Sequence, residues 1–141
     1  MKAVYETIRS RFNQLKVNTF QRLFTGRLES GLTASEVLTL YVIDMLDTPT
    51  IKNFADYVGI SQSNATYRIA ALVEKGYVDK VVSQTDRRES HLFTTWKCKK
   101  LLREDSRRAE DLEAILRSRF TDEQLETAKE VFEVLLDYSK E

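Results

Sequence analysis

The stretch Ser83-Gln84-Thr85-Asp86-Arg87-Arg88-Glu89-Ser90 decides the fold that we predict for this chain. It is polar, it carries an adjacent pair of arginines, and it lies between two short β-prone runs at residues 77–82 and 91–95. We expect these runs to pair as a hairpin, because the connection is too long and too polar for a two-residue turn. A compact helical unit over residues 50–75 comes just before it. A helix pair followed by an arginine-tipped hairpin is suited to contact two grooves of DNA at once.

The helical unit before the hairpin divides into two helices. Residues 47–50, which include the only proline, end a helix at 37–46 and start a short helix at 51–58. Gly59 supplies the left-handed residue that ends this short helix, and Ser61 is a good N-cap for the next helix at 62–74. The apolar positions expected to face inward on that second helix are Ala65, Ile69, Leu72 and Val73.

The remaining segments predict a mainly α fold. Apolar residues recur at helical spacing over 3–24, 96–119 and the segment after the capping box at 121–124. A second capping box, Thr33 to Glu36, opens the helix at 37–46, whose apolar residues lie nearly all round, so we expect it to be the buried central element. We predict a winged helix-turn-helix DNA-binding domain over 33–97, with dimerisation helices at 1–32 and 98–141 that bury their broad apolar stripes against a second copy.

Composition excludes several classes of protein. The 141 residues suit one core-bearing domain, and no apolar run reaches the roughly 20 residues that cross a bilayer. The N-terminus lacks an apolar signal-peptide core, so we expect a cytoplasmic protein without a membrane partner. One cysteine and one histidine exclude an internal disulfide and a multi-ligand zinc site, and no cofactor is expected. The sequence has no glycine-rich phosphate loop and no nucleophile elbow, which argues against an enzyme.

Charge is distributed unevenly although it sums to zero over the chain. Residues 61–100 carry eight basic and four acidic side chains, whereas residues 101–141 carry seven basic and twelve acidic ones. A basic middle block with an acidic tail is typical of a module that presents one face to nucleic acid. Uneven charge also arises by chance on helical surfaces, so the pattern does not decide the matter alone.

The start of the second helix carries the side chains that we expect to read bases. Gln and Asn can bind an adenine edge through two hydrogen bonds, Arg can bind guanine or phosphate, and the threonine methyl group can pack on thymine. A free helix N-terminus also suits a phosphate. Surface helices usually favour Glu and Lys, yet no acidic residue occurs from Ser61 to Val73. The predicted recognition residues are Ser61, Gln62, Ser63, Asn64, Thr66, Tyr67 and Arg68.

The arginine pair at the hairpin tip is the second predicted DNA contact. Asp86 lies two residues before Arg88 and can hold its guanidinium through a bidentate pair. Such an arginine is oriented in advance for a narrow, electronegative minor groove, while Arg87 can contact phosphate. The alternative interpretation is a solvated turn whose charges are incidental.

These two segments together resemble the MarR (multiple-antibiotic-resistance repressor) family of winged-helix regulators. The run Glu74-Lys75-Gly76-Tyr77-Val78 is similar to the family's Leu-x-Glu-Lys-Gly stretch, and Asp86-Arg87-Arg88-x-x-x-Leu92-x-x-Thr95 is similar to its wing motif. Thr94 stands where the family has a second leucine, and Cys98 where it has a glycine. The specific motifs cover about residues 50–102.

The resemblance implies a homodimer in which each recognition helix enters a major groove and each wing the flanking minor groove. The operator is then a pseudo-palindrome with half-sites about one helical turn apart. By the same resemblance, Arg88 is the wing arginine and Asp86 its orienting aspartate. The family also implies a repressor that a small aromatic or phenolic ligand releases from DNA, here in a pocket of Phe12, Phe20, Tyr41 and Met45. Plain core is the interpretation that we favour for those four residues.

Two alternative functions remain open at the level of sequence. Cys98 lies between Lys97 and Lys99, which can lower a thiol pKa, so a thiol-based redox-responsive regulator is one of them. The other is a winged-helix protein-interaction module that does not bind DNA, since fold does not fix function. The retained Arg87–Arg88 pair and the polar recognition face favour DNA binding over both.

Overall fold

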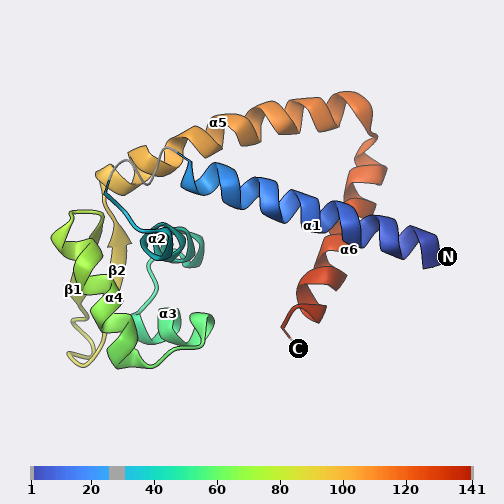
Figure 1. Ribbon diagram of the computed structural model, residues 1–141. Coiled ribbons are helices and arrows are strands. Elements are labelled where there is room, and N and C mark those ends of the chain that lie inside the picture. Colours follow the sequence, from blue (N-terminus) through green and yellow to red (C-terminus); the bar gives the residue numbers. More distant parts are fainter. Residues whose placement is uncertain (1, 26–30, 141) are drawn as a thin grey trace. The chain divides into compact units, whose positions relative to one another are not determined.

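We analysed a computed structural model of the protein, which describes residues 2–25 and 31–140 (Figure 1). The elements in chain order are α1 (Lys2–Phe24), α2 (Ala34–Leu46), α3 (Ile51–Val58), α4 (Gln62–Glu74), β1 (Val78–Val82), β2 (Ser90–Thr94), α5 (Trp96–Arg119) and α6 (Asp122–Tyr138). The chain divides into two compact units, Met1–Leu101 and Leu102–Glu141, and the division falls within α5. The mainly α class and the winged helix-turn-helix are confirmed.

Capping side chains fix where the helices of the first unit begin. Thr33 and Glu36 form the predicted capping box at α2, and Ser61 caps α4 by accepting a hydrogen bond from the Asn64 N–H. Thr50 and Asn53 form another capping box at α3, which the sequence analysis did not single out because Asn replaces the usual Glu or Gln. Gly59 has a left-handed φ of 77° and ends α3 as predicted.

The wing is an antiparallel pair in which Val78 pairs with Thr94 and Val82 with Ser90. A third segment joins it: Thr50 forms an isolated bridge with His91, and the Leu92 N–H donates to the Pro49 carbonyl at 2.8 Å. This connection was not predicted, because a single bridged residue leaves no periodic pattern in a sequence. It attaches the start of α3 directly to the wing, so the helix pair and the hairpin form one body.

The core of the first unit lies where α2, α3, α4 and β2 meet (Figure 1). Its largest fully buried side chains include Leu40, Ile43, Phe54, Ile69, Leu72 and Leu92. Two expectations about the core were wrong in detail. Val73 is 38% exposed, and α2 buries only one side because Leu38 and Met45 are exposed as well. The helix α2 is central, but some of its apolar side chains are not covered by the rest of the single chain.

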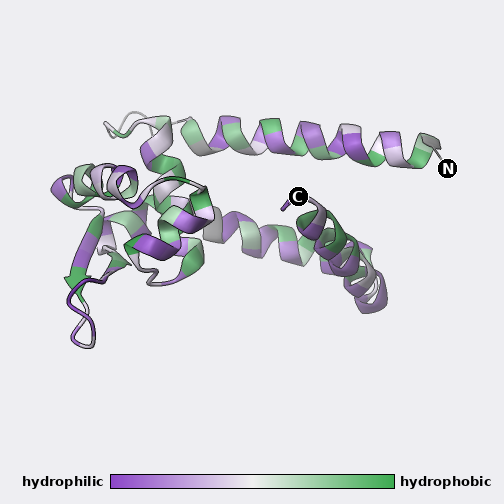
Figure 2. Ribbon diagram, turned by 90° about the horizontal axis from the view of Figure 1, so that it is seen from below, coloured by the Kyte–Doolittle hydropathy of each residue, from purple (hydrophilic) through white to green (hydrophobic). Residues whose placement is uncertain are grey.

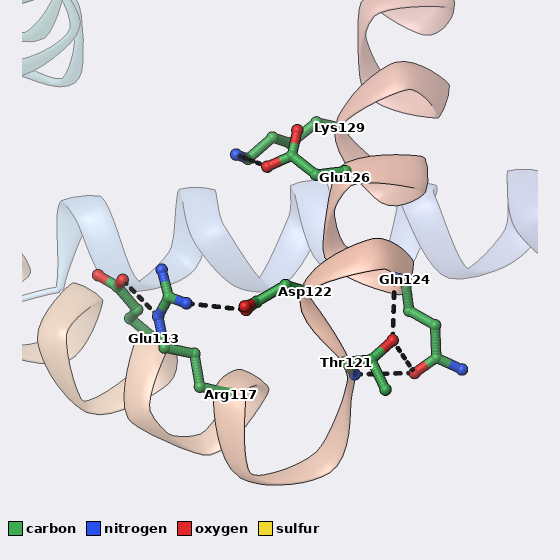
Figure 3. A network of polar contacts seen from close by, with 7 residues as sticks. All are labelled: Glu113, Arg117, Thr121, Asp122, Gln124, Glu126 and Lys129. Atoms are coloured by element: carbon green, nitrogen blue, oxygen red, sulfur yellow. Dashed lines mark hydrogen bonds and ion pairs between the residues drawn. The ribbon is translucent and has the colours of Figure 1, made fainter.

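The terminal helices keep much apolar surface exposed in the single chain. Figure 2 shows hydrophobic and hydrophilic residues interspersed along α1, and Val4, Tyr5 and Leu15 are each more than half exposed. In the second unit, Thr121 and Gln124 form the predicted capping box at α6. Arg117 joins the end of α5 to the start of α6 through ion pairs with Glu113 and Asp122 (Figure 3). Across residues 2–25 and 31–140, no helix has the length and apolarity to cross a membrane.

Candidate nucleic-acid interface

The first turn of α4 presents polar side chains to solvent. Gln62, Ser63, Asn64 and Thr66 are exposed, and Tyr67 is 80% exposed. The buried positions Ala65, Ile69 and Leu72 lie on the other side and anchor the helix in the core. Helical spacing alone produces this separation, since residues three and four apart share a face. The predicted recognition residues therefore gather on one solvent-facing surface, with Arg68 half-buried at its edge.

Local hydrogen bonds decide what some of these side chains can offer to DNA. The Ser61 hydroxyl is engaged as the cap of α4 and lies 3.2 Å from the Ser63 hydroxyl. The Thr66 hydroxyl donates to the Gln62 carbonyl at 2.8 Å, so its proton is not available to a base. Gln62 and Asn64 are therefore the side chains best placed to form bidentate hydrogen bonds with a base edge.

The wing tip holds Arg88 in a defined orientation. Its Nε and Nη2 atoms donate to the two Asp86 carboxylate oxygens, each at 3.1 Å, and its backbone N–H donates to Oδ1 at 3.0 Å. The Arg88 side chain nevertheless stays 90% exposed. The hydrogen bonds from Arg88 lower the pKa of Asp86, and the same pair raises the pKa of Arg88. The guanidinium is thus oriented at the protein surface before any ligand arrives.

The backbone of the wing tip is ordered by its own hydrogen bonds. The Ser83 hydroxyl accepts from the N–H groups of Thr85 and Asp86, both at 3.3 Å. The Ser83 N–H donates to the Glu89 carbonyl, and the Glu89 N–H donates to that of Asp86. Arg87 is exposed and has no ion pair within the described part of the chain. The tip therefore presents one arginine held by Asp86 and one exposed arginine, Arg87, with no ion pair among the described residues.

Long-range hydrogen bonds and an ion pair fix the carboxyl end of α4, and they involve residues outside the predicted interface. Lys75 Nζ lies 2.8 Å from Glu36 Oε2 at the start of α2, and it also donates to the Gly31 carbonyl. Lys97 of α5 donates to the Lys75 carbonyl at 2.9 Å, and Thr95 donates to the Gly76 carbonyl at 2.7 Å. These bonds join residues 19 to 44 positions apart, and no sequence pattern marks such pairs.

The four side chains of the suggested effector pocket come from two helices. Phe12 and Phe20 lie on α1, with Phe20 stacked on Phe24 at a centroid distance of 6.0 Å, and Tyr41 and Met45 lie one turn apart on α2. Phe12 and Tyr41 are half-buried, whereas Phe20 and Met45 are 45% and 58% exposed. Plain core is therefore wrong for Phe20 and Met45 in the single chain.

Cys98 does not have the environment of a reactive thiol. It is fully buried, and burial together with the Asp44 carboxylate raises its pKa to about 11 although Lys99 acts in the opposite direction. Its backbone N–H is bonded to the Thr95 hydroxyl at 3.3 Å. Cys98 is a packed core side chain, and the redox alternative loses its physical basis because the thiolate is the reactive form.

His91 has a structural contact rather than a set of metal ligands around it. One ring nitrogen, Nδ1, lies 3.2 Å from the Thr48 carbonyl, in the turn between α2 and α3 where Asp47 and Thr48 have positive φ. Among the described residues, no group of three or more His, Cys, Asp or Glu side chains could hold a metal ion.

Comparison with known proteins supports the same assignment of the fold. Residues 30–89, from before α2 to the wing tip, match the model of the MarR family. No curated protein sequence matches the chain. Among solved structures, a MarR transcriptional regulator from Methanosarcina mazei is 24% identical, with a TM-score of 0.64 over 95% of this chain and 96% of the other.

Two further structures extend the likeness. FabT of Streptococcus pneumoniae, solved in complex with DNA, is 20% identical with a TM-score of 0.72, covering 99% of this chain and 96% of FabT. A transcriptional regulator of Thermotoga maritima is 17% identical with a TM-score of 0.67, covering 96% and 99% of the two chains. At these identities the structures establish the fold. The winged-helix part of the chain, residues 30–89, is thus similar to the MarR family in sequence, and the whole chain is similar to MarR regulators in fold.

Proposed function

We propose that this protein is a dimeric, sequence-specific regulator that binds a pseudo-palindromic operator in double-stranded DNA. The observation that carries the proposal is Arg88, which is held by Asp86 at the wing tip and yet is 90% exposed. Its partner surface is the polar first turn of α4, where Gln62 and Asn64 face solvent in the same unit. One surface enters a major groove and reads base edges, and the other enters the flanking minor groove.

Dimerisation is supported by the apolar surface that the single chain exposes. In the second unit, α5 and α6 line a cleft of about 740 Å³ whose apolar residues include Leu112, Leu116, Leu125 and Phe132. Leu112 and Phe132 are each 54% exposed, which is costly for large apolar side chains unless a partner covers them. We propose a second copy as that partner, and twofold symmetry then accounts for a palindromic operator.

The regulatory effect that we propose is repression, released by a small aromatic or phenolic ligand. Exposed Met45 and Phe20 give the protein apolar surface of the kind such ligands use, and Tyr41 supplies a polar handle. The measurement is displacement of the bound operator by a series of aromatic acids and phenols. Variants Met45→Ala and Phe20→Ala should shift the displacing concentration without changing affinity for DNA alone.

The proposal is tested by selecting bound sequences from random duplex DNA with the purified full chain at moderate salt. We expect an inverted repeat whose half-sites are separated by about 10 base pairs, one helical turn. Variants Gln62→Ala and Asn64→Ala should relax the preference at single positions by about 1–3 kcal/mol. If the protein retains DNA but enriches no sequence, and the retention is lost as salt rises, the binding is non-specific electrostatic attraction. That result would favour the protein-interaction module.

A further inference from the structure

A polar cleft of about 480 Å³ lies between the helix pair and the wing. Its lining combines the start of α3, the first turn of α4, and facing residues of β1, β2 and the wing tip. We call it the wing cleft, and it is lined by Thr50, Ile51, Lys52, Gln62, Thr66, Lys80, Asp86, Arg88, Glu89 and Ser90. It therefore lies between the base-reading surface and the wing arginine, and it belongs to one compact unit.

The wing cleft is lined by more basic side chains than acidic ones. Lys52, Lys80 and Arg88 line it together with two carboxylates, and Asp86 already binds Arg88 through both oxygens. Lys52 and Lys80 are exposed, and their side chains have no ion pair or hydrogen bond among the residues that the structure describes. Two lysines thus converge on one hollow without a partner, and Glu89 is the one carboxylate that opposes an anion there.

The backbone geometry makes this convergence a fixed feature. Lys80 pairs with the buried Leu92 in the β ladder, so the strand face that carries it is anchored in the core. Lys52 is in the first turn of α3, whose start is attached to β2 by the Thr50–His91 bridge and by the Leu92–Pro49 hydrogen bond. The backbone positions of both lysines at the cleft are therefore held by one hydrogen-bonded frame.

We propose that the wing cleft is a seat for a single phosphodiester of the DNA backbone, with Lys52 and Lys80 as its ligands. This inference rests on the proposed DNA binding, and it adds two residues to the proposed groove contacts of α4 and the wing tip. A phosphate held between α4 and the wing sets the distance between the major-groove and minor-groove contacts. Lys52 and Lys80 thereby position both reading surfaces without reading any base themselves.

The test uses fluorescence anisotropy with the selected operator duplex and the full chain. Lys80→Ala and Lys52→Ala should each lower affinity equally for every duplex, roughly five- to tenfold at 0.1 M salt, and each should reduce the salt slope by about one. Lys80→Arg, which keeps the charge, should restore both quantities. Glu89→Gln should strengthen binding, because it removes the opposing carboxylate. Lys140→Ala, which removes a lysine outside the cleft, is the matched control and should change neither.

A second experiment replaces single phosphates of the duplex, one at a time, by neutral methylphosphonate groups. It distinguishes binding of a DNA phosphate in the wing cleft from binding of free phosphate there. At one position in each half-site, this substitution should lower the affinity of the wild-type protein. The same substitution should not lower the affinity of Lys80→Ala any further. If wild-type protein binds the operator and the lysine variants keep its affinity and salt slope, the phosphate seat is wrong while the proposed function stands. If wild-type protein binds no duplex, both are overturned. Matching thermal melts of the variants exclude misfolding as the cause.

Discussion

At the scale of single residues, the pair Asp86 and Arg88 allows the sharpest separation of two physical effects. Removing the Asp86 charge should strengthen binding to a polyanion if only net charge matters. The structure leads to the opposite expectation, because Asp86 holds the Arg88 guanidinium through both carboxylate oxygens. The Arg88 side chain is 90% exposed, and Asp86 is its one ion-pair partner among residues 2–25 and 31–140, so its rotamers are freed when Asp86 is lost.

We therefore predict that Asp86→Asn weakens operator binding, by about fivefold, because the freed Arg88 side chain must then lose its rotamer entropy on binding. Most of the loss should fall on duplexes with A·T-rich flanks, where an inserted arginine gains most. Anisotropy titrations with flanks of differing composition measure this. Glu89→Gln removes the same charge without a hydrogen bond to Arg88, and it should act in the opposite direction. Stronger binding by Asp86→Asn would show that orientation of Arg88 by Asp86 does not contribute to DNA binding.

At the scale of secondary structure elements, the bond between α2 and α4 determines how firmly the recognition helix is held. Glu36 caps α2 through Thr33 and also binds Lys75, just beyond the end of α4. Burial of Glu36 alone would raise its pKa, but the hydrogen bonds from Lys75 and Thr33 outweigh burial and lower the pKa from its ordinary value of 4.5. The folded state therefore favours the charged carboxylate.

We predict that Glu36→Gln lowers the free energy of unfolding by about 0.5–1 kcal/mol near neutral pH, from the lost ion pair with Lys75, because Gln can keep the capping hydrogen bond. Since the folded pKa is lowered, the Glu36 contribution is present above the unfolded pKa and is lost as pH falls through the folded pKa. The difference between wild type and variant should accordingly shrink below about pH 4. Urea unfolding at several pH values measures it.

The control for this prediction is an exposed ion pair on a single helix. Lys129 and Glu126 lie three residues apart on α6, and both side chains are more than 60% exposed (Figure 3). Glu126→Gln should change the free energy of unfolding by less than about 0.5 kcal/mol, because solvent screens such pairs. Equal losses in the two variants would mean that the long-range Glu36–Lys75 bond contributes nothing particular to the fold.

At the scale of the whole molecule, the exposed apolar surface of α5 and α6 predicts the oligomeric state. Phe132→Asp places a charge in the cleft between these helices, at a side chain that is 54% exposed in the single chain. We expect a monomer that keeps its helical circular dichroism and binds operator more weakly, because two linked half-sites become independent. Sedimentation equilibrium measures the mass. Val81→Asp, on the 52% exposed Val81 of β1, should leave the dimer intact.

Much of this architecture could be predicted from local signals in the sequence. The bounds of α3, α4 and α5 follow from capping residues, Gly59 and helical periodicity, which act within a few residues of each other. The Asp86–Arg88 pair is equally local, since two residues of a tight turn can reach one another in few ways. Polar side chains at the start of α4 were likewise assigned to an exposed surface from spacing alone.

Only the tertiary structure decided the features that join distant segments. The Thr50–His91 bridge, the Glu36–Lys75 bond and the meeting of Lys52 with Lys80 each depend on how separate elements pack. The exposure of Val73 and the burial of Cys98 were set in the same way, because burial depends on which neighbours cover a residue. Periodicity identifies the apolar side of a helix, but it carries no information about what covers that side. For this reason the sequence determined the elements and the wing pair, and packing determined the cleft between them.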